Sequence, residues 1–424
     1  MAGTQAVILA AGEGTRMRPL TSNRPKPLLF VAGKRLIEHQ LDALAGAGVK
    51  EAVLVIGHSE RVLRQFFESN PHKVKVRYVE QSRRLGTGHA LLQARSAVKG
   101  RFVVMNGDII LSERDLKAFV SGAAKGAGAS MAGFKVDDVS TLGELEVKGG
   151  QLSSIKEKEG PSRPGLANVG LYSLSEEVFD ILDSLPLSPR GEYELTDALT
   201  AMAGGGTAKA GLKSRRTSSS GVAVHQLKDR WLDLAYPWQL LDANEALLAG
   251  LTRKIAGEVE RGALVEGAVR VGRGTLVRAG AYIEGPVFIG DDCHIGPNCY
   301  IRPSTAIADG CHVGAGSEIK NSILFAKTNA PHLNYVGDSI LGEEVNLGAG
   351  TCIANLRLDS DPVECVVRGE RVSTGKKKLG AMIGDRVKIG INASISVGTI
   401  IGEDSMVGMG ARVSGTLEAG SRVH

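Results

Sequence analysis

The chain has 424 residues and a net charge of +5, with 43% hydrophobic and 23% charged residues. This length predicts two or three domains, each able to bury its own core. The mild charge does not predict nucleic-acid binding, which requires a concentrated basic face, and the chain has no apolar run long enough to span a membrane. Because the N-terminus also lacks the basic-then-apolar pattern of a signal peptide, we expect a cytoplasmic protein.

Residues 1–235 alternate strand-like and helix-like segments and are predicted to form the first domain. Strands are expected at 6–12, 51–57, 75–80 and 101–108, and helices at 35–48 and 86–98. Repeated β-α-β units predict an α/β fold, Rossmann-like, with a mixed, mostly parallel sheet. In such sheets ligands bind at the carboxyl ends of the strands.

The loop after the first strand, "GEGTRMRPLTSNRPKPLL" (12–29), combines glycines, cations and prolines. It matches neither a dinucleotide fingerprint, because position 17 is methionine, nor a Walker A loop. Glycines allow backbone N–H groups to approach phosphate oxygens, Arg16 can bind phosphates through two parallel hydrogen bonds, and Lys26 adds a point charge. We therefore predict a triphosphate-binding loop; the alternative is a solvated basic turn.

Residues 236–258 are predicted to form a linker helix, with Pro237 in its first turn and Gly257 at its C-terminus. Residues 259–424 then carry a six-residue repeat, which predicts a C-terminal left-handed parallel β-helix with residues 18 apart stacked in neighbouring coils. The repeated aliphatic positions are Val265, Val271, Val277, Ile283, Ile289, Ile295, Ile301, Ile307, Val313, Ile319, Phe325, Leu341, Leu347, Ile353, Ile383, Ile389, Ile395, Ile401, Val407 and Val413.

Two stretches interrupt the repeat, 326–340 and 356–380, and both are predicted to leave the solenoid. The second contains "VECVVRGERVSTGKKK", which we expect to form an external hairpin. Its three lysines, Lys376 to Lys378, could attract the phosphates of a ligand, but a solvated charge run is the favoured interpretation.

Arg302 and Lys320 occupy the same repeat position 18 residues apart, so we expect them to stack on one face and form a phosphate site. A surface ion pair between Arg302 and Glu284 is the alternative. The five cysteines form no CxxC pair, which argues against a disulfide framework or a zinc site.

The first half resembles the sugar-1-phosphate nucleotidylyltransferases in "LAAGEGTRMRPLTSNRPKPLL", "EQSRRLGTGHAL", "NGD", "IKEKEG", "NVGLY", "GEYELTDAL" and "WLDLAYPWQLLDAN". The family couples a nucleoside triphosphate to a sugar phosphate and releases pyrophosphate. The resemblance implies catalytic roles for Arg16 and Lys26 and a Mg²⁺ ion held by Asp108 and Asp233. It further implies nucleotide contacts from Leu9, Ala10, Ala11, Gly12, Gln81, Gly86 and Thr87, and sugar-phosphate contacts from Gly143, Glu157, Lys158 and Asn168.

The segment "APHLNYVGDSILGEEVNLGAGTCIANL" resembles the acetyltransferase half of the bifunctional enzymes that make UDP-N-acetylglucosamine. The resemblance implies that His332 is the general base, since the pKa of histidine lies near neutrality. It implies that Arg302, Lys320, Tyr335, Asn346 and Asn355 bind the amino sugar phosphate and that Ala349 lies near acetyl-CoA. An exposed loop histidine is the alternative for His332.

The leading hypothesis is an enzyme with both activities, acetylating glucosamine 1-phosphate and transferring a uridylyl group from UTP, and assembling as a homotrimer. One alternative is a glucose-1-phosphate thymidylyltransferase that uses dTTP and has a weak or inactive β-helix domain. Another is a non-catalytic regulatory scaffold that binds nucleotide sugars. The choice between UTP and dTTP, and between glucosamine and galactosamine, stays open at the level of sequence.

Overall fold

The computed structural model describes residues 4–57, 60–126, 128–156, 162–204 and 221–424, and the chain divides into two compact units. The first unit comprises residues 1–13 and 36–233, and the second comprises residues 14–35 and 234–424. The predicted phosphate-binding loop therefore begins in the first unit and continues into the second. None of the helices within the described residues is long and apolar enough to cross a membrane.

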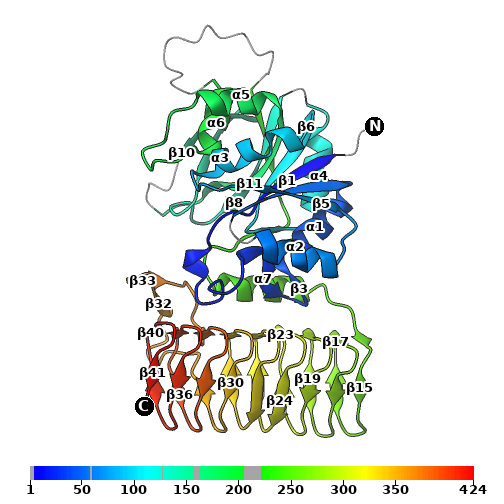
Figure 1. The fold of residues 1–424 in the computed structure, drawn as a ribbon, viewed down its shortest axis with the longest axis vertical. Coiled ribbons are helices and arrows are strands. Elements are labelled where there is room, and N and C mark those ends of the chain that lie inside the picture. The colour runs from blue at the N-terminus through cyan, green and yellow to red at the C-terminus, as the bar shows by residue number, and fades with distance from the viewer. Residues whose placement is uncertain (1–3, 58–59, 127, 157–161, 205–220) are drawn as a thin grey trace. The chain divides into compact units, whose positions relative to one another are not determined.

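A nine-stranded mixed sheet, in the order β5-β4-β1-β6-β11-β8-β12-β10-β9, forms the centre of the first unit (Figure 1). β1 pairs in parallel with β4 and β6, whereas β11 runs antiparallel to β6. The mixed sheet confirms the predicted α/β fold class, but it is less parallel than expected, because β10 and β11 run antiparallel to their neighbours. Its strands are β1 (Gln5–Leu9), β4 (Glu51–Ile56), β5 (Lys75–Glu80), β6 (Arg101–Asn106), β8 (Ala129–Val136), β9 (Glu144–Lys148), β10 (Gln151–Lys156), β11 (Gly165–Ser175) and β12 (Val222–Gln226).

The apolar run of β1 explains its central place, because Ala6, Val7 and Ile8 are completely buried. Helices α3, α5 and α6 contact one another, and α1 contacts α4. A separate antiparallel pair joins β7 to β13. The remaining elements of this unit are α1 (Leu36–Gly46), α2 (Glu60–Ser69), α3 (Thr87–Gln93), η3 (Arg95–Ala97), β7 (Ile109–Leu111), α4 (Glu113–Ala123), α5 (Glu177–Ser184), α6 (Leu195–Met202) and β13 (Trp231–Asp233).

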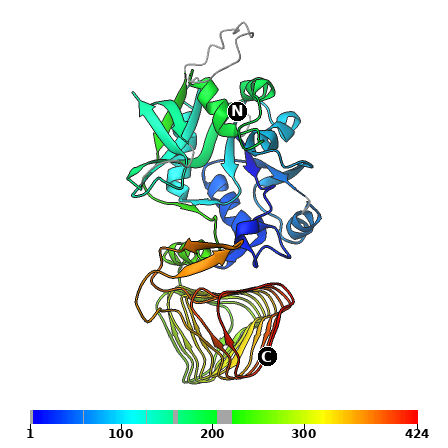
Figure 2. The same cartoon turned by 90° about the vertical axis from the view of Figure 1, so that its left-hand side faces the viewer.

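The second unit is a parallel β-helix whose coils are triangular in cross-section (Figure 2), in agreement with the predicted left-handed hexapeptide solenoid. Before it come η1 (Thr15–Met17), η2 (Lys26–Leu28), β2 (Phe30–Val31), β3 (Lys34–Arg35) and α7 (Gln239–Leu248). The helix α7 is shorter than the predicted 236–258, since the first strand of the solenoid already begins at Lys254.

Three faces of parallel strands build the solenoid. The first face holds β14 (Lys254–Ile255), β17 (Val269–Val271), β20 (Val287–Ile289), β23 (Thr305–Ile307), β26 (Ile323–Leu324), β29 (Ile340–Leu341), β34 (Met382–Ile383), β37 (Ile400–Ile401) and β40 (Thr416–Leu417). The second holds β15 (Glu258–Val259), β18 (Leu276–Val277), β21 (His294–Ile295), β24 (His312–Ala315), β27 (Asn329–His332), β30 (Asn346–Leu347), β35 (Lys388–Ile389), β38 (Met406–Val407) and β41 (Arg422–Val423). The third holds β16 (Leu264–Glu266), β19 (Tyr282–Glu284), β22 (Tyr300–Ile301), β25 (Glu318–Lys320), β28 (Tyr335–Gly337), β31 (Cys352–Ile353), β36 (Ser394–Ile395) and β39 (Arg412–Val413).

The predicted excursion at 326–340 is wrong, because this stretch supplies β27 and β28 and stays within the coils. Leu324, not Phe325, pairs with Ile307 and with Leu341, 17 residues away in each direction. One side of the coil is therefore a residue shorter than the repeat, which shifts Phe325 out of the interior column. Its ring packs against Phe30 instead, with the centroids 6.1 Å apart.

The second predicted excursion is confirmed. It carries an antiparallel hairpin of β32 (Glu364–Val367) and β33 (Glu370–Ser373), which leaves the solenoid between β31 and β34. Lys376 of the lysine run forms an ion pair with Asp242 of α7. This contact gives Lys376 a structural role rather than leaving it in a solvated charge run.

Candidate active sites

The predicted nucleotide site begins where β1 and β6 end side by side. The N–H of Gly107 donates to the carbonyl of Leu9 at 2.9 Å, and the N–H of Ala10 donates to the carbonyl of Val55 at 2.8 Å. A Cβ atom on Gly107 would lie 2.7 Å from the Leu9 carbonyl oxygen, so only glycine allows this approach. The turn that carries Asp108 is thereby held against the start of the loop.

The two predicted metal ligands, Asp108 and Asp233, are brought together by the pairing of β7 with β13. Asp233 lies opposite Ile109 in the antiparallel register, next to Asp108 in the chain. Mg²⁺ prefers oxygen ligands and is commonly held by one or two carboxylates together with substrate phosphates and water. The residues at this position therefore fit a Mg²⁺ ion.

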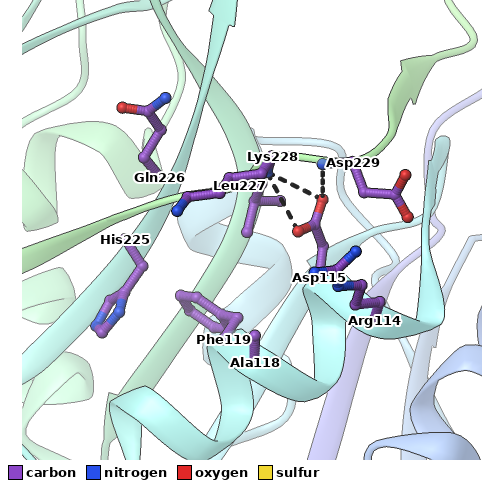
Figure 3. Close-up of a pocket in the computed structure, with 9 residues that line it drawn as sticks. All are labelled: Arg114, Asp115, Ala118, Phe119, His225, Gln226, Leu227, Lys228 and Asp229. Atoms are coloured by element: carbon purple, nitrogen blue, oxygen red, sulfur yellow. Dashed lines mark hydrogen bonds between the residues drawn. The ribbon is translucent and has the colours of Figure 1, made fainter.

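The loop before β13 is fixed by a carboxylate that sequence reasoning missed. Asp115 is 6% exposed and accepts hydrogen bonds from the backbone N–H groups of Lys228, Asp229 and Arg230 at 3.2, 2.7 and 3.2 Å. The same carboxylate lies in the wall of a cavity of about 390 Å³ that His225 also lines (Figure 3). This cavity contains no residue predicted to act on substrate.

Three of the predicted nucleotide-binding residues, Gln81, Gly86 and Thr87, lie after β5. Gln81 is buried, and its side-chain amide donates to the carbonyl of Gly86 at 3.1 Å and lies 3.0 Å from Nδ1 of His89. Burial, and then the charge of Arg83, lowers the pKa of His89, which favours a neutral ring that can accept from Gln81.

Gly86 has a φ of 95°, and a Cβ atom there would lie 2.6 Å from the carbonyl oxygen of Tyr193. That carbonyl accepts from the N–H of Gly88 at 2.7 Å, while the hydroxyl of Thr87 accepts from the N–H of Leu195 at 3.0 Å. The backbone of the "GEYELTDAL" segment therefore supports the turn at Gly86–Gly88, a role that the sequence did not reveal.

Two of the predicted sugar-phosphate residues, Gly143 and Asn168, are in contact. The N–H of Asn168 donates to the carbonyl of Gly143 at 2.8 Å, and the side-chain amide of Asn168 donates to the hydroxyl of Tyr172 at 3.0 Å. The other two, Glu157 and Lys158, lie outside the described residues.

The cations of the loop lie in the second unit and have different surroundings. Arg16 is exposed and lies over the ring of Tyr236, at 5.5 Å from its centroid. Lys26 opens η2 between two prolines. Arg24, by contrast, forms an ion pair with Asp385 of the β-helix.

The two cations of the predicted phosphate site lie on the third face of the β-helix. Arg302 and Lys320 stack in neighbouring coils, and each contacts a carboxylate: Arg302 contacts Glu318 at 2.8 Å, and Lys320 contacts Asp338 at 3.0 Å. The alternative partner proposed for Arg302, Glu284, instead accepts from the hydroxyl of Tyr300 at 2.7 Å.

Tyr335 and Asn355 converge over Gly337, one coil above Lys320. A Cβ atom on Gly337 would lie 2.6 Å from Nδ2 of Asn355 and 2.8 Å from the hydroxyl of Tyr335. The absence of a side chain on Gly337 keeps open the space between these two polar groups. Lys320, Tyr335 and Asn355 are therefore neighbours, and Arg302 lies one coil below Lys320. The fifth predicted amino-sugar-phosphate residue, Asn346, lies on another face, beside Asn329.

His332 ends β27 at a corner of the coil and is exposed. Its N–H donates to the side chain of the buried Asn334 at 3.2 Å, and Asn334 in turn donates to the carbonyl of Gly348 at 2.8 Å. The carbonyl of His332 accepts from the N–H of Gly350 at 3.2 Å, so Ala349 lies one coil beyond His332 at the same corner. The predicted base and the predicted acetyl-CoA contact are thus adjacent.

The family models that match the chain cover both units. Residues 5–250 match the nucleotidyl transferase family, residues 283–380 match the GMPPB C-terminal domain, and residues 380–414 match the hexapeptide repeat of succinyl-transferase.

Two relatives align along nearly the whole chain. A Methanococcus maripaludis protein named bifunctional protein GlmU is 42% identical over 424 residues, covering 99% of this chain and 97% of the relative. A Sulfurisphaera tokodaii protein named bifunctional sugar-1-phosphate nucleotidylyltransferase/acetyltransferase is 35% identical and covers 97% of each chain. A Bacillus anthracis crystal structure described as a glucose-1-phosphate thymidylyltransferase is 25% identical, with a TM-score of 0.51, over 57% of this chain and 95% of its own.

Proposed function

The chain belongs to the bifunctional sugar-1-phosphate nucleotidylyltransferase/acetyltransferase family, and on this basis we propose that it completes UDP-N-acetylglucosamine in two steps at two sites. Glucosamine 1-phosphate is first acetylated by acetyl-CoA, and the product then receives a uridylyl group from UTP. The observation that carries the proposal is that two relatives of 42% and 35% identity, both named bifunctional and one of them named for both activities, align with this chain along almost its full length.

In the nucleotidyl transfer, a phosphate oxygen of N-acetylglucosamine 1-phosphate attacks the α-phosphorus of UTP. The bond to the β-phosphate breaks, and pyrophosphate leaves with the electron pair. Arg16 and Lys26 offset the repulsion between the two anionic reactants, while Gln81 and the Gly86 turn hold the base. Asp108 and Asp233 would hold Mg²⁺, which when bound neutralises charge on the phosphate oxygens.

In the acetyl transfer, the amino nitrogen of glucosamine 1-phosphate attacks the thioester carbonyl of acetyl-CoA, and His332 takes a proton from that amino group. The carbon–sulfur bond breaks and CoA leaves as its thiol. Lys320, Tyr335 and Asn355 orient the amino sugar phosphate on the third face of the coil, and Arg302 contributes a second cation. The backbone contacts of Asn334 and Gly350 hold His332 at the corner where Ala349 would face CoA.

Thymidylyl transfer is the competing reaction, because uracil and thymine differ by one methyl group and a pocket rarely rejects a methyl strongly. The solved structure described as a thymidylyltransferase corresponds to only 57% of this chain. The Methanococcus maripaludis and Sulfurisphaera tokodaii relatives extend over the β-helix and are both named bifunctional, which favours the uridylyltransferase.

Asp108→Asn and His332→Ala test the two sites separately. We expect Asp108→Asn to lower Mg²⁺-dependent pyrophosphate release by at least about 100-fold, since one oxygen ligand loses its charge, and to leave acetyl transfer unchanged. His332→Ala should abolish thiol release from acetyl-CoA and leave pyrophosphate release intact. Pyrophosphate would be measured with UTP and dTTP in parallel; loss of both activities in either variant would contradict the two-site proposal.

A further inference from the structure

The loop after β1 is fixed to the β-helix by an ion pair that leaves Arg24 unavailable to a phosphate. The guanidinium of Arg24 donates to both carboxylate oxygens of Asp385, at 3.1 and 2.8 Å, and lies 3.1 Å from Glu343. The side chains of Arg24 and Asp385 are only 8% and 2% exposed. Asn23 adds a further hydrogen bond to Asp385 at 3.2 Å. Two-pronged, buried pairs of this kind fix geometry as well as charge.

Aromatic packing fixes the same segment a few residues later. Phe30 packs against Phe288 and Phe325, with both centroid distances 6.1 Å, and the ring of Phe325 also lies 5.1 Å from the guanidinium carbon of Arg24. Gly33 has a φ of 87°, and a Cβ atom there would lie 2.4 Å from the ring of Phe288. The chain therefore approaches the β-helix as closely as its backbone allows.

A hydrogen-bond relay forms the third attachment. The N–H of Ala32 donates to the side chain of Asn244 in α7 at 2.9 Å, and Asn244, which is completely buried, donates to the carbonyl of Ser304 at 2.7 Å. Within the second unit, residues 23–33 are thus attached to the β-helix and α7 through an ion pair, an aromatic cluster and a buried amide. The β-helix supplies a partner in each of the three attachments.

The attached segment includes one of the predicted phosphate-binding groups, Lys26. Lys26 follows Arg24 by two residues, between Pro25 and Pro27, so little backbone freedom separates it from the anchored guanidinium. On the other side, the hydroxyl of Thr21 donates to the carbonyl of Gly14 at 2.8 Å, closing the turn that carries Arg16.

We propose that Asp385, in the β-helix, is a positioning residue for nucleotidyl transfer: by holding Arg24 it sets the loop that presents Arg16 and Lys26 to the nucleotide triphosphate. The inference rests on the roles given to Arg16 and Lys26 under the proposed function. A residue of the β-helix would thus contribute to nucleotidyl transfer as well. Changing Asp385 should weaken nucleotide binding even though Asp385 itself does not contact the nucleotide.

Three variants of the full chain test this inference. Asp385→Asn leaves the charge of Arg24 without its closest carboxylate, and Arg24→Gln removes the cation while leaving intact the 2.8 Å bond from the N–H of Glu343 to Asp385. The control is Asp404→Asn, which breaks an exposed pair with Arg386, the residue next to Asp385. Steady-state kinetics with UTP and with acetyl-CoA, and calorimetric titration with UTP and Mg²⁺, are measured on all of them and on the double variant.

We expect the Michaelis constant for UTP to rise at least about tenfold in Asp385→Asn and in Arg24→Gln, with acetyl transfer within twofold of wild type. The Michaelis constant of the double variant for UTP should be no higher than that of Arg24→Gln alone, because both substitutions break the same contact between Arg24 and Asp385. Unchanged UTP affinity, additive losses, or a parallel fall in acetyl transfer would overturn the inference. If the wild-type chain released no pyrophosphate, that result would count against the proposed function. The inference about Asp385 would still be decided by the calorimetric comparison of UTP affinity between the wild type and Asp385→Asn.

Discussion

At the scale of single residues, three buried aspartates hold the candidate sites together. Asp115, Asp338 and Asp385 are 6%, 3% and 2% exposed, and each accepts several hydrogen bonds. A carboxylate is costly to bury unless such partners satisfy it. Each of the three therefore binds its neighbours in a fixed arrangement, and none of them is predicted to touch substrate.

Asp338 is the member closest to the acetyl-transfer chemistry. Its carboxylate accepts from Lys320 at 3.0 Å, from Asn321 at 2.7 Å and from Asn355. We expect Asp338→Asn to raise the Michaelis constant for glucosamine 1-phosphate about tenfold with a smaller effect on kcat, because Lys320 and Asn355 lose their shared partner. Kinetics at varied amino sugar phosphate would measure this.

The matched control for Asp338→Asn is Asp359→Asn, since Asp359 is exposed and pairs only locally with Arg357. It should behave as wild type. If Asp338→Asn instead lowered kcat about tenfold and left the Michaelis constant for glucosamine 1-phosphate unchanged, Asp338 would not orient the substrate-binding groups.

The residue types of the candidate sites could be predicted from the sequence. The buried residues that hold these site residues in place could not. Glycines, cations and carboxylates at strand ends are visible in "LAAGEGTR" and "NGD". Asp385 gives no such signal, because its partner Arg24 lies 361 residues away and nothing in the local pattern joins them. Asp338 lay inside a quoted motif, yet its buried position becomes visible only once the coil is known to be short there.

At the scale of elements, the two-stranded pair of β7 and β13 determines whether Asp108 and Asp233 can share a cation. β13 has only three residues, and short isolated ribbons are marginally stable. The three N–H bonds to Asp115 hold the chain just before it. We therefore expect Asp115 to help fix the register of β13.

Asp115→Asn should loosen this ribbon. We expect the Mg²⁺ concentration for half-maximal pyrophosphate release to rise about three- to tenfold, because Asp233 is less firmly placed, while acetyl transfer stays constant. A Mg²⁺ titration of activity would measure the change, with Asp180→Asn on α5 as the exposed control. A loss of activity that excess Mg²⁺ fails to reverse would argue against this role for Asp115.

The solenoid shows where periodicity alone stops being informative. A strict six-residue repeat predicted most of the interior column, and Val313, Ile319 and Ile353 are indeed completely buried. Phe325 continued the apolar repeat by coincidence, although Leu324 is the residue that faces inward. A bulky side chain beside another apolar residue fits both registers, and only the pairing with Leu341 separates them.

At the scale of the whole molecule, the sequence indicated two domains joined by a helix, and it could not indicate that residues 14–35 belong to the second compact unit. Domain boundaries are read from local composition, whereas this assignment comes from contacts with residues far along the chain, such as Phe288 and Asp385. A chain cut near residue 258 would lack both partners. For this reason we expect such a fragment to transfer nucleotides less well than the full chain.

The corner of the β-helix that carries His332 also has an apolar ridge. Ala349, Ile391 and Met409 follow His332 coil by coil, since Asn392 donates to the carbonyl of Ala349 and Gly410 to that of Ile391, both at 2.8 Å. Ile391 is 50% exposed and Met409 is 78% exposed. A solvent-exposed cluster of apolar side chains favours contact with another protein surface. We therefore expect this corner to form the interface between subunits of the predicted homotrimer.

The double variant Ile391→Asp/Met409→Asp should convert the trimer to monomers, because it introduces two charges on each chain into a contact that would otherwise exclude water. Acetyl transfer should fall at least about tenfold, since His332 lies on the same ridge, whereas pyrophosphate release should persist. Light scattering and the two assays would measure this, with Leu358→Asp as the control because Leu358 is fully exposed on the excursion that carries the hairpin. A monomeric wild type, or a double variant that stays trimeric with full acetyl transfer, would place the assembly surface elsewhere.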